Sequence, residues 1–136
     1  MSEIAINLSL QEAQYEIDLS GTAAQFASLV NRVNHLTKYS PDVLSLRYKP
    51  SAYPTAMRQL WLEQVDQSNG LITVQVNDII LKLLGNSQAF YKLTVFLESL
   101  SNLRPGEHFH LDWFSNEDLL APTTASMSFI FSMEID

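Results

Sequence analysis

The chain of 136 residues has no cysteine, only four glycines and only three histidines. The absence of cysteine excludes disulfide bonds, thiolate metal ligands and cysteine nucleophiles. Phosphate-binding loops are disfavoured because neither Gly-x-x-x-x-Gly-Lys-Ser/Thr nor Gly-x-Gly-x-x-Gly occurs in the sequence. No serine stands in a Gly-x-Ser-x-Gly motif either. We therefore expect a protein that is not an enzyme and that holds no cofactor.

Long apolar runs and targeting signals are also lacking. No segment approaches the roughly 20 apolar residues that a membrane-spanning helix needs. Residues 1–7 carry no positive charge and no long apolar run, so they do not resemble a signal peptide. The lack of cysteine fits a reducing compartment. We expect one compact domain, cytoplasmic and without contact to a membrane, since 136 residues suffice to bury a core.

The net charge of −7 is concentrated in the second half of the chain. Residues 1–64 hold six acidic and five basic residues, whereas residues 65–136 hold nine acidic and three basic ones. An acidic half repels nucleic acid and attracts basic partners. The alternative is that this acidity only keeps the chain in solution.

Residues 17–36 align without a gap on residues 81–100. Five of the twenty positions are identical, among them the glycines at 21 and 85 and the phenylalanines at 26 and 90. Each copy predicts a strand, a glycine, a capping residue and an amphipathic helix, which indicates an internal repeat. The alternative is convergence, because any two amphipathic helices share leucine spacing.

Hydrophobic periodicity predicts the same order of elements in each half. The first half has a hairpin over 3–19, a helix that Thr22 caps and that residues 39–41 close, and strands over 43–48 and 59–65. The turn Asn69-Gly70 separates the halves. The second half has strands over 71–76 and 79–84 around the turn Asn77-Asp78, a helix over 87–100 capped by Asn86, and strands over 108–114 and 125–135. We expect Gly21 to adopt a backbone conformation that other residues avoid.

These elements predict an α+β fold built from a duplicated ββαββ unit. Residues 1–68 form the first repeat, residues 69–136 form the second, and the two share one core. Two helices would pack on one face of a mainly antiparallel sheet, because that arrangement buries the apolar stripe of each helix.

The segment Glu107-His-Phe-His-Leu-Asp112 carries the densest set of polar ligands. In a strand, His108, His110 and Asp112 share one face, and alternate residues lie roughly 6–7 Å apart. Two imidazoles and a carboxylate are a ligand set for zinc or non-haem iron, which Glu117 or Asp118 would complete. The alternative is a strand that buries Phe109 and shows a polar face to water.

Basic and aromatic residues lie together between residues 47 and 61, where Arg47, Lys49 and Arg58 accompany Tyr48, Tyr53 and Trp61. Such interleaving is found in surfaces on which nucleic-acid bases stack. The chain has only eight basic residues against fifteen acidic ones, however, which is too little positive charge for a nucleic-acid-binding surface. The aromatic residues of the chain, including Trp113, therefore either fill the sheet face or anchor a protein contact.

From Gly85-Asn-Ser to Gly106-Glu-His-Phe-His-Leu-Asp112, the sequence resembles the family numbered thirty-two among bacterial polymorphic-toxin immunity proteins. The shared features are a Gly-Asn opening, a leucine-rich helix, the histidine-containing strand and a closing apolar strand. The resemblance covers residues of about 71–134. The corresponding strand of the first half, Val43-Leu-Ser-Leu-Arg-Tyr48, has no histidine pair.

The resemblance implies a cytoplasmic protein that binds and neutralises one cognate toxin without catalysis. Such a toxin would be basic, to match the acidic chain, and the protein itself a monomer or a homodimer. We expect the contacts to lie at Glu107, His108, His110, Asp112, Glu117 and Asp118. A metal-binding or small-ligand-binding protein centred on His108, His110 and Asp112 is the alternative. A homo-oligomeric scaffold joined through an exposed outer strand is a third possibility.

Overall fold

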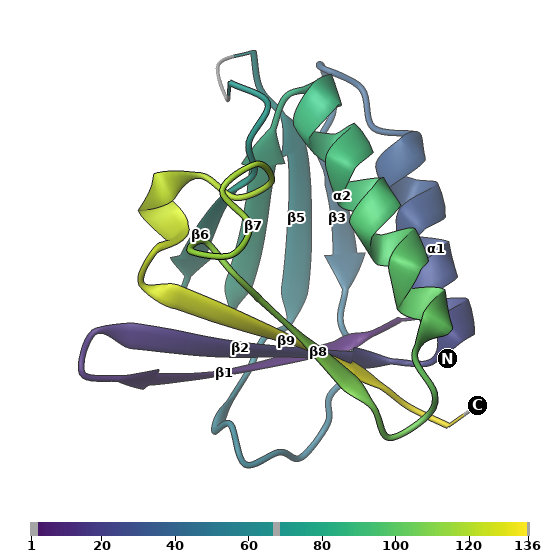
Figure 1. Ribbon diagram of the computed structural model, residues 1–136, viewed down its shortest axis with the longest axis vertical. Helices are drawn as coiled ribbons and strands as arrows, with labels where there is room; N and C mark the ends of the chain where they lie inside the picture. The colour runs from purple at the N-terminus through teal and green to yellow at the C-terminus, as the bar shows by residue number, and fades with distance from the viewer. Residues whose placement is uncertain (1–2, 67–68, 136) are drawn as a thin grey trace.

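The computed structural model describes residues 3–66 and 69–135, and Figure 1 shows the arrangement of their helices and strands. The first half contains β1 (Ala5–Gln11), β2 (Gln14–Gly21), α1 (Ala23–Asn34), β3 (Asp42–Ser45), β4 (Thr55–Ala56) and β5 (Gln59–Gln64). The second half contains β6 (Thr73–Asn77), β7 (Ile80–Gly85), α2 (Ser87–Ser99), the 3-10 helix η1 (Leu100–Asn102), β8 (His108–Asp112), the 3-10 helix η2 (Pro122–Thr124) and β9 (Met127–Met133).

The α+β class is confirmed, but the described strands form two mixed sheets rather than one. The five-stranded sheet has the order β4-β1-β2-β9-β8, and the four-stranded sheet has the order β3-β5-β7-β6. Pairing is mainly antiparallel, as expected, except that β2 runs parallel to β9 and β5 runs parallel to β7. In Figure 1 the four-stranded sheet stands upright, the five-stranded sheet runs across its lower end, and α1 and α2 lie along one side.

Each sheet combines a hairpin from one half of the chain with two strands from the other half. The hairpin β1–β2 joins β9 and β8, whereas the hairpin β6–β7 joins β5 and β3. An equivalent hydrogen bond occurs where each hairpin meets the strand from the other half. The amide of Glu134 donates to Gly21 O (2.8 Å) in one sheet, and the amide of Val65 donates to Gly85 O (2.9 Å) in the other. Each helix carries the chain from one sheet to the other: α1 connects β2 to β3, and α2 connects β7 to β8.

The equivalent places of the two hairpins in their sheets are compatible with the predicted repeat. The repeat boundaries 1–68 and 69–136 stay a prediction. Residues 67 and 68, at the expected junction, lie outside the described residues. Beside the junction, Asn69 and Gly70 have positive φ of 51° and 74°, as the predicted turn requires. The first half departs from ββαββ by the additional short strand β4, which pairs with β1.

Both helices begin where the sequence predicts. The Thr22 hydroxyl accepts a hydrogen bond from the Gln25 amide, and the Gln25 side chain accepts one from the Thr22 amide, which completes a capping box. The Asn86 side chain accepts from the Ala89 amide (2.8 Å) at the start of α2. Helix α1 ends at Asn34, earlier than expected, because a tight turn bridged between Thr37 and Ser40 returns the chain to β3.

Gly21 and Gly85 are required for close packing and not for an unusual backbone. Neither has a positive φ, so the conformation expected for Gly21 is wrong. A Cβ atom on Gly21 would lie 2.8 Å from Ile4 Cγ2, and one on Gly85 would lie 2.9 Å from Ala89 Cβ. The repeated glycine therefore allows the end of each hairpin to pack tightly against its neighbours.

Some boundaries also differ from the prediction. The β6–β7 turn lies at Asp78 and Ile79, one residue later than expected, and Asp78 has a φ of 57°. The last strands are shorter than predicted because residues 113–126 form turns and η2. Strand β4 was not predicted, since two residues carry no periodic signal.

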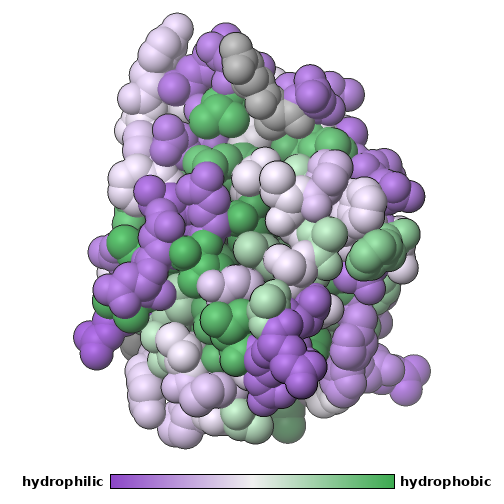
Figure 2. All heavy atoms as spheres, turned by 90° about the vertical axis from the view of Figure 1, so that its left-hand side faces the viewer, coloured by the Kyte–Doolittle hydropathy of each residue, from purple (hydrophilic) through white to green (hydrophobic). Residues whose placement is uncertain are grey.

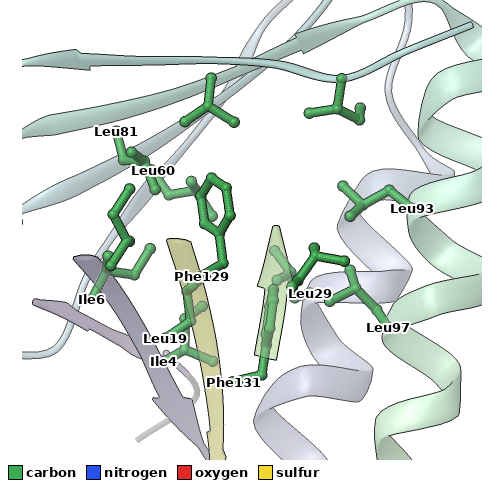
Figure 3. Close-up of a cluster of buried hydrophobic side chains, with 14 of the residues drawn as sticks. Ile4, Ile6, Leu19, Leu29, Leu60, Leu81, Leu93, Leu97, Phe129 and Phe131 are labelled. Atoms are coloured by element: carbon green, nitrogen blue, oxygen red, sulfur yellow. The ribbon is translucent and has the colours of Figure 1, made fainter. Parts of the chain in front are cut away.

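The core lies between the two sheets and the two helices (Figure 3). Strand β9 projects Phe129 and Phe131 into this space, and both are buried. Leu60 and Leu81 contribute from the four-stranded sheet, and the helices add further leucines, of which Figure 3 labels Leu29, Leu93 and Leu97. Phe129 and Phe131 thus connect all three layers.

One end of the space between the sheets is closed by the segment that leads to β9. The amide of Ile72 donates to Leu119 O (2.8 Å), and the amide of Ala121 donates to Ile72 O (2.9 Å). Leu119 and Leu120 are buried there. Figure 2 shows this side of the molecule, where hydrophobic atoms are visible between hydrophilic ones.

We expect Gly85→Ala to lower the free energy of unfolding by about 1–3 kcal/mol, because the new methyl group would overlap Ala89 Cβ and Ile72 Cδ1. Chemical denaturation followed by circular dichroism measures the change. The double variant Gly85→Ala plus Ala89→Gly removes the nearer clash and should recover part of the loss. An unchanged midpoint for the single variant would contradict close packing at this glycine.

Candidate functional site

Strand β8 is an edge strand of the five-stranded sheet and, within the described part of the chain, pairs with β9 alone. His108 and His110 are exposed, and their ring centroids lie 5.6 Å apart in an edge-on arrangement. His108 lies opposite Ser132 and His110 lies opposite Ile130, on the side of the sheet away from the helices. The two imidazoles are therefore neighbours on an accessible surface.

Asp112 does not join the two histidines in a metal site. Its Oδ1 atom accepts a hydrogen bond from the Ser115 amide (2.9 Å), which fixes the turn that follows β8. Within residues 3–66 and 69–135, no group of three or more histidine, aspartate or glutamate side chains is arranged to hold a metal ion. This arrangement does not favour the metal hypothesis.

The other predicted contact residues lie at the two ends of β8. Before the strand, Glu107 Oε1 accepts a hydrogen bond from the Arg104 amide (2.6 Å). After the strand, Glu117 and Asp118 are exposed in a loop that lies against α2. The structure thus places these carboxylates around β8 but does not gather them with the histidines.

Lys92 of α2 holds in place the loop over residues 115–120, which carries Glu117 and Asp118 and which we call the acidic loop. Its Nζ atom donates to Asp118 O (2.9 Å) and to Gly70 O (3.0 Å), so one ammonium group joins the loop to the turn before β6. Between α2 and the loop lies an open hollow of about 480 Å³, lined by apolar atoms of Tyr91, Val95 and Leu119 among others.

Four large hydrophobic side chains near β8 are exposed. The exposed fractions are 70% for Phe114, 69% for Tyr91, 52% for Val95 and 43% for Phe109. Together with Glu107, Glu117 and Asp118 they make up what we call the α2–β8 surface. In Figure 1, α2, β8 and the loop after β8 all lie toward the viewer.

Sequence reasoning missed most of this surface, although a signal was present. Tyr91 and Val95 are apolar residues four positions apart that fall off the buried stripe of α2, which contains Phe90, Leu93 and Leu97. Phe109 was expected to be buried in one of the alternatives, whereas it is only partly covered by Phe96.

A chain of aromatic contacts supports the surface from within. The Phe109 ring packs edge-on against Phe96, with centroids 5.5 Å apart, and Phe96 packs in the same way against Phe131 at 5.0 Å. Phe131 in turn approaches Phe26 of α1 at 6.3 Å. Edge-to-face rings at such distances attract one another, so Phe109 is held on the core.

The basic and aromatic residues between 47 and 61 do not form a cationic platform. Arg47 and Lys49 both pair with Glu134, at 2.6 and 2.9 Å. Lys82 Nζ lies 4.8 Å from the centre of the Trp61 ring, and the indole NH donates to Glu63 (2.8 Å). Most of the positive charge here is therefore already matched.

Tyr53 lies near Glu16 and Asp18, which come from β2. Burial raises the pKa of the Tyr53 hydroxyl above its usual value, and the negative charges of the two carboxylates raise this pKa further. A phenol whose pKa is raised stays protonated at neutral pH. It acts here as a hydrogen-bond donor to Glu16 and not as a base.

Comparisons with protein-family models, with curated proteins and with solved structures found no match for this chain. Among the described residues, no helix combines the length and apolar character needed to cross a membrane.

We expect Lys92→Met to loosen the acidic loop, because it removes both hydrogen bonds of the ammonium group but keeps most of the aliphatic stem. Hydrogen exchange followed by mass spectrometry should show faster exchange in residues 116–120. The free energy of unfolding should fall by about 1 kcal/mol, since the side chain is partly exposed. Unaltered exchange of that segment would show that Lys92 does not position the loop.

Proposed function

We propose that this chain is an immunity-type protein, which binds a cognate bacterial toxin and neutralises it without catalysis. The observation that carries the proposal is the α2–β8 surface, on which exposed Tyr91, Val95, Phe109 and Phe114 stand among carboxylates. The resemblance of residues of about 71–134 to immunity proteins of family thirty-two supports the same function.

The composition of this surface suits a protein partner. Large rigid aromatic side chains lose little entropy on binding and dominate the energetics of many interfaces. Phe109 is already packed on Phe96, and Phe96 also lines the hollow of about 480 Å³ between α2 and the loop after β8. A partner could therefore insert an apolar side chain beside α2 without large rearrangement of this chain.

The carboxylates favour a basic partner. Residues 96–119 contain five acidic side chains and one basic side chain, Arg104. A local excess of negative charge accelerates the encounter with a positively charged surface, and this effect weakens as salt is added. A toxin that acts on nucleic acid carries such a positive surface, which the acidic loop would cover in place of the phosphates.

Binding without turnover is part of the proposal. Tyr53, whose pKa is raised by burial and by the charges of Glu16 and Asp18, donates a hydrogen bond to Glu16 instead of accepting a proton. The α2–β8 surface offers apolar contact and charge, which are features of recognition.

The first test is affinity capture with the tagged chain from its source organism, followed by mass spectrometry. We expect one stoichiometric partner that contains a toxin domain. The purified pair should then bind more weakly to the variant Glu117→Lys plus Asp118→Lys, by about 10- to 100-fold, because two attractive charges become repulsive. Titration calorimetry at two salt concentrations measures both the affinity and its salt dependence.

A matched control changes the net charge equally at another place. Glu12 lies in the β1–β2 turn, and Asp66 makes only an exposed ion pair with Lys38. The variant Glu12→Lys plus Asp66→Lys should bind within about threefold of the unchanged chain, since exposed ion pairs contribute little. The proposal would be refuted by an acidic partner, by binding without salt dependence, or by the lack of any specific partner in toxin-expressing cells.

A further inference from the structure

Strand β8 presents a row of unpaired backbone groups to solvent. The amide of Met133 donates to Glu107 O (2.9 Å), and hydrogen-bonded pairs in an antiparallel ladder recur at every second residue. Phe109 and Leu111 therefore direct their backbone groups toward β9, as does the carbonyl of Glu107, whose amide donates to Arg104 O (2.9 Å). The backbone groups of His108, His110 and Asp112 point the other way, and β9 is the only strand that pairs with β8 among the described residues.

The corresponding edges elsewhere are covered or poorly suited to pairing. Strand β4 covers β1, and residues 119–121 pair with Ile72 at the start of the β6 edge. Strand β3 has only four residues, and it directs outward the backbone groups of two of them, Val43 and Ser45, where β8 offers three. An uncovered edge with exposed apolar neighbours is a template for a further strand.

The sequence of β8 is complementary to itself in the antiparallel direction. In the register centred on His110, the outward backbone groups of His108 meet those of Asp112 in a second copy, and the same pair forms again across the axis. These are the residues whose backbone groups are free, so the ladder can form without a shift. An imidazole then stands opposite a carboxylate twice, which is a favourable cross-strand pair.

The apolar residues of the strand fit the same register. Phe109, with 43% exposure, comes opposite Leu111 of the second copy on the helix side of the sheet.

We propose that two copies of this chain associate through antiparallel pairing of their β8 strands, centred on His110, and so form one continuous ten-stranded sheet. The dimer buries apolar edge residues that a monomer exposes. The contact is small, so we expect a micromolar dissociation constant, on the order of 10 μM. A toxin that uses the α2–β8 surface would compete with the second copy, but the dimer itself does not depend on the proposed function.

The test is sedimentation velocity of the purified chain at concentrations from about 5 to about 500 μM. This range spans the dissociation constant of about 10 μM that we expect for a small interface. We expect the mass to rise from that of one chain to that of two. A chain that stays monomeric throughout this range would overturn the proposal. Because no toxin is present, this result is separate from the test of toxin binding.

Replacement of a single amide identifies the edge that pairs. His110→Pro removes an outward amide but leaves the hydrogen bonds between β8 and β9 intact. Edge strands tolerate proline where the amide faces solvent, as it does at this position. His110→Ala is the matched control, since it removes the side chain but keeps the amide. We expect His110→Pro to raise the dissociation constant at least tenfold over His110→Ala. Equal values for the two variants, or a dimer that His110→Pro leaves intact, would overturn β8 pairing.

A charge exchange provides a second variant should His110→Pro fail to fold. His108→Glu sets a carboxylate opposite Asp112 twice in the dimer and should weaken it about fivefold or more. Adding Asp112→Asn to His108→Glu removes the repulsion and keeps the Oδ1 acceptor for the Ser115 amide, so the dissociation constant should return to within about threefold of the original. Failure of the second substitution to restore association would refute the register centred on His110.

Discussion

The parallel pairing of β2 with β9 is the interaction on which the rest of the structure depends. It joins Tyr15–Gly21 to Met127–Met133, segments more than 100 positions apart in the sequence. Without it, the hairpin β1–β2 would have only the two-residue strand β4 as a neighbour, and β8–β9 would have none. The pairing also sets which face of β9 points inward. A shift of one residue would replace Phe129 and Phe131 in the core by Ser128, Ile130 and Ser132.

The α2–β8 surface is a consequence of this pairing. Because Phe131 faces inward, it meets Phe26 on one side and Phe96 on the other, and Phe96 holds Phe109 at the sheet edge. The partly exposed Phe109 is thus the outermost member of an aromatic series that starts in the core. A side chain held in this way loses little further freedom on binding, which favours affinity. Long-range pairing of this kind is expected to make folding slow relative to helical proteins of equal size.

Local signals predicted the elements well, and they predicted the sheets poorly. Apolar periodicity and the caps at Thr22 and Asn86 placed both helices, because these signals depend on neighbours within a few residues. The division into two sheets depends on which strands meet after the chain has passed through each helix, and no local pattern encodes that choice. The role of Gly21 was misjudged because it depends on packing and not on the backbone of the glycine itself. Its need to lack a side chain comes from Ile4, which lies beside it at the end of the β1–β2 hairpin.

Among the candidate contact residues, too, local sequence features were predicted and features that depend on packing were not. Glu107, His108, His110, Asp112, Glu117 and Asp118 were predicted from the sequence, because charge and alternation are visible in it, and their role stays a prediction. Tyr91, Val95 and Phe114 were not, because the exposure of an apolar residue depends on what packs against it. Exposed apolar residues on a second face of a helix form a patch of the kind that marks contact sites. In this chain the second face of α2 adjoins the free edge of β8, so in the proposed complex one partner would contact both the apolar side chains and the backbone groups.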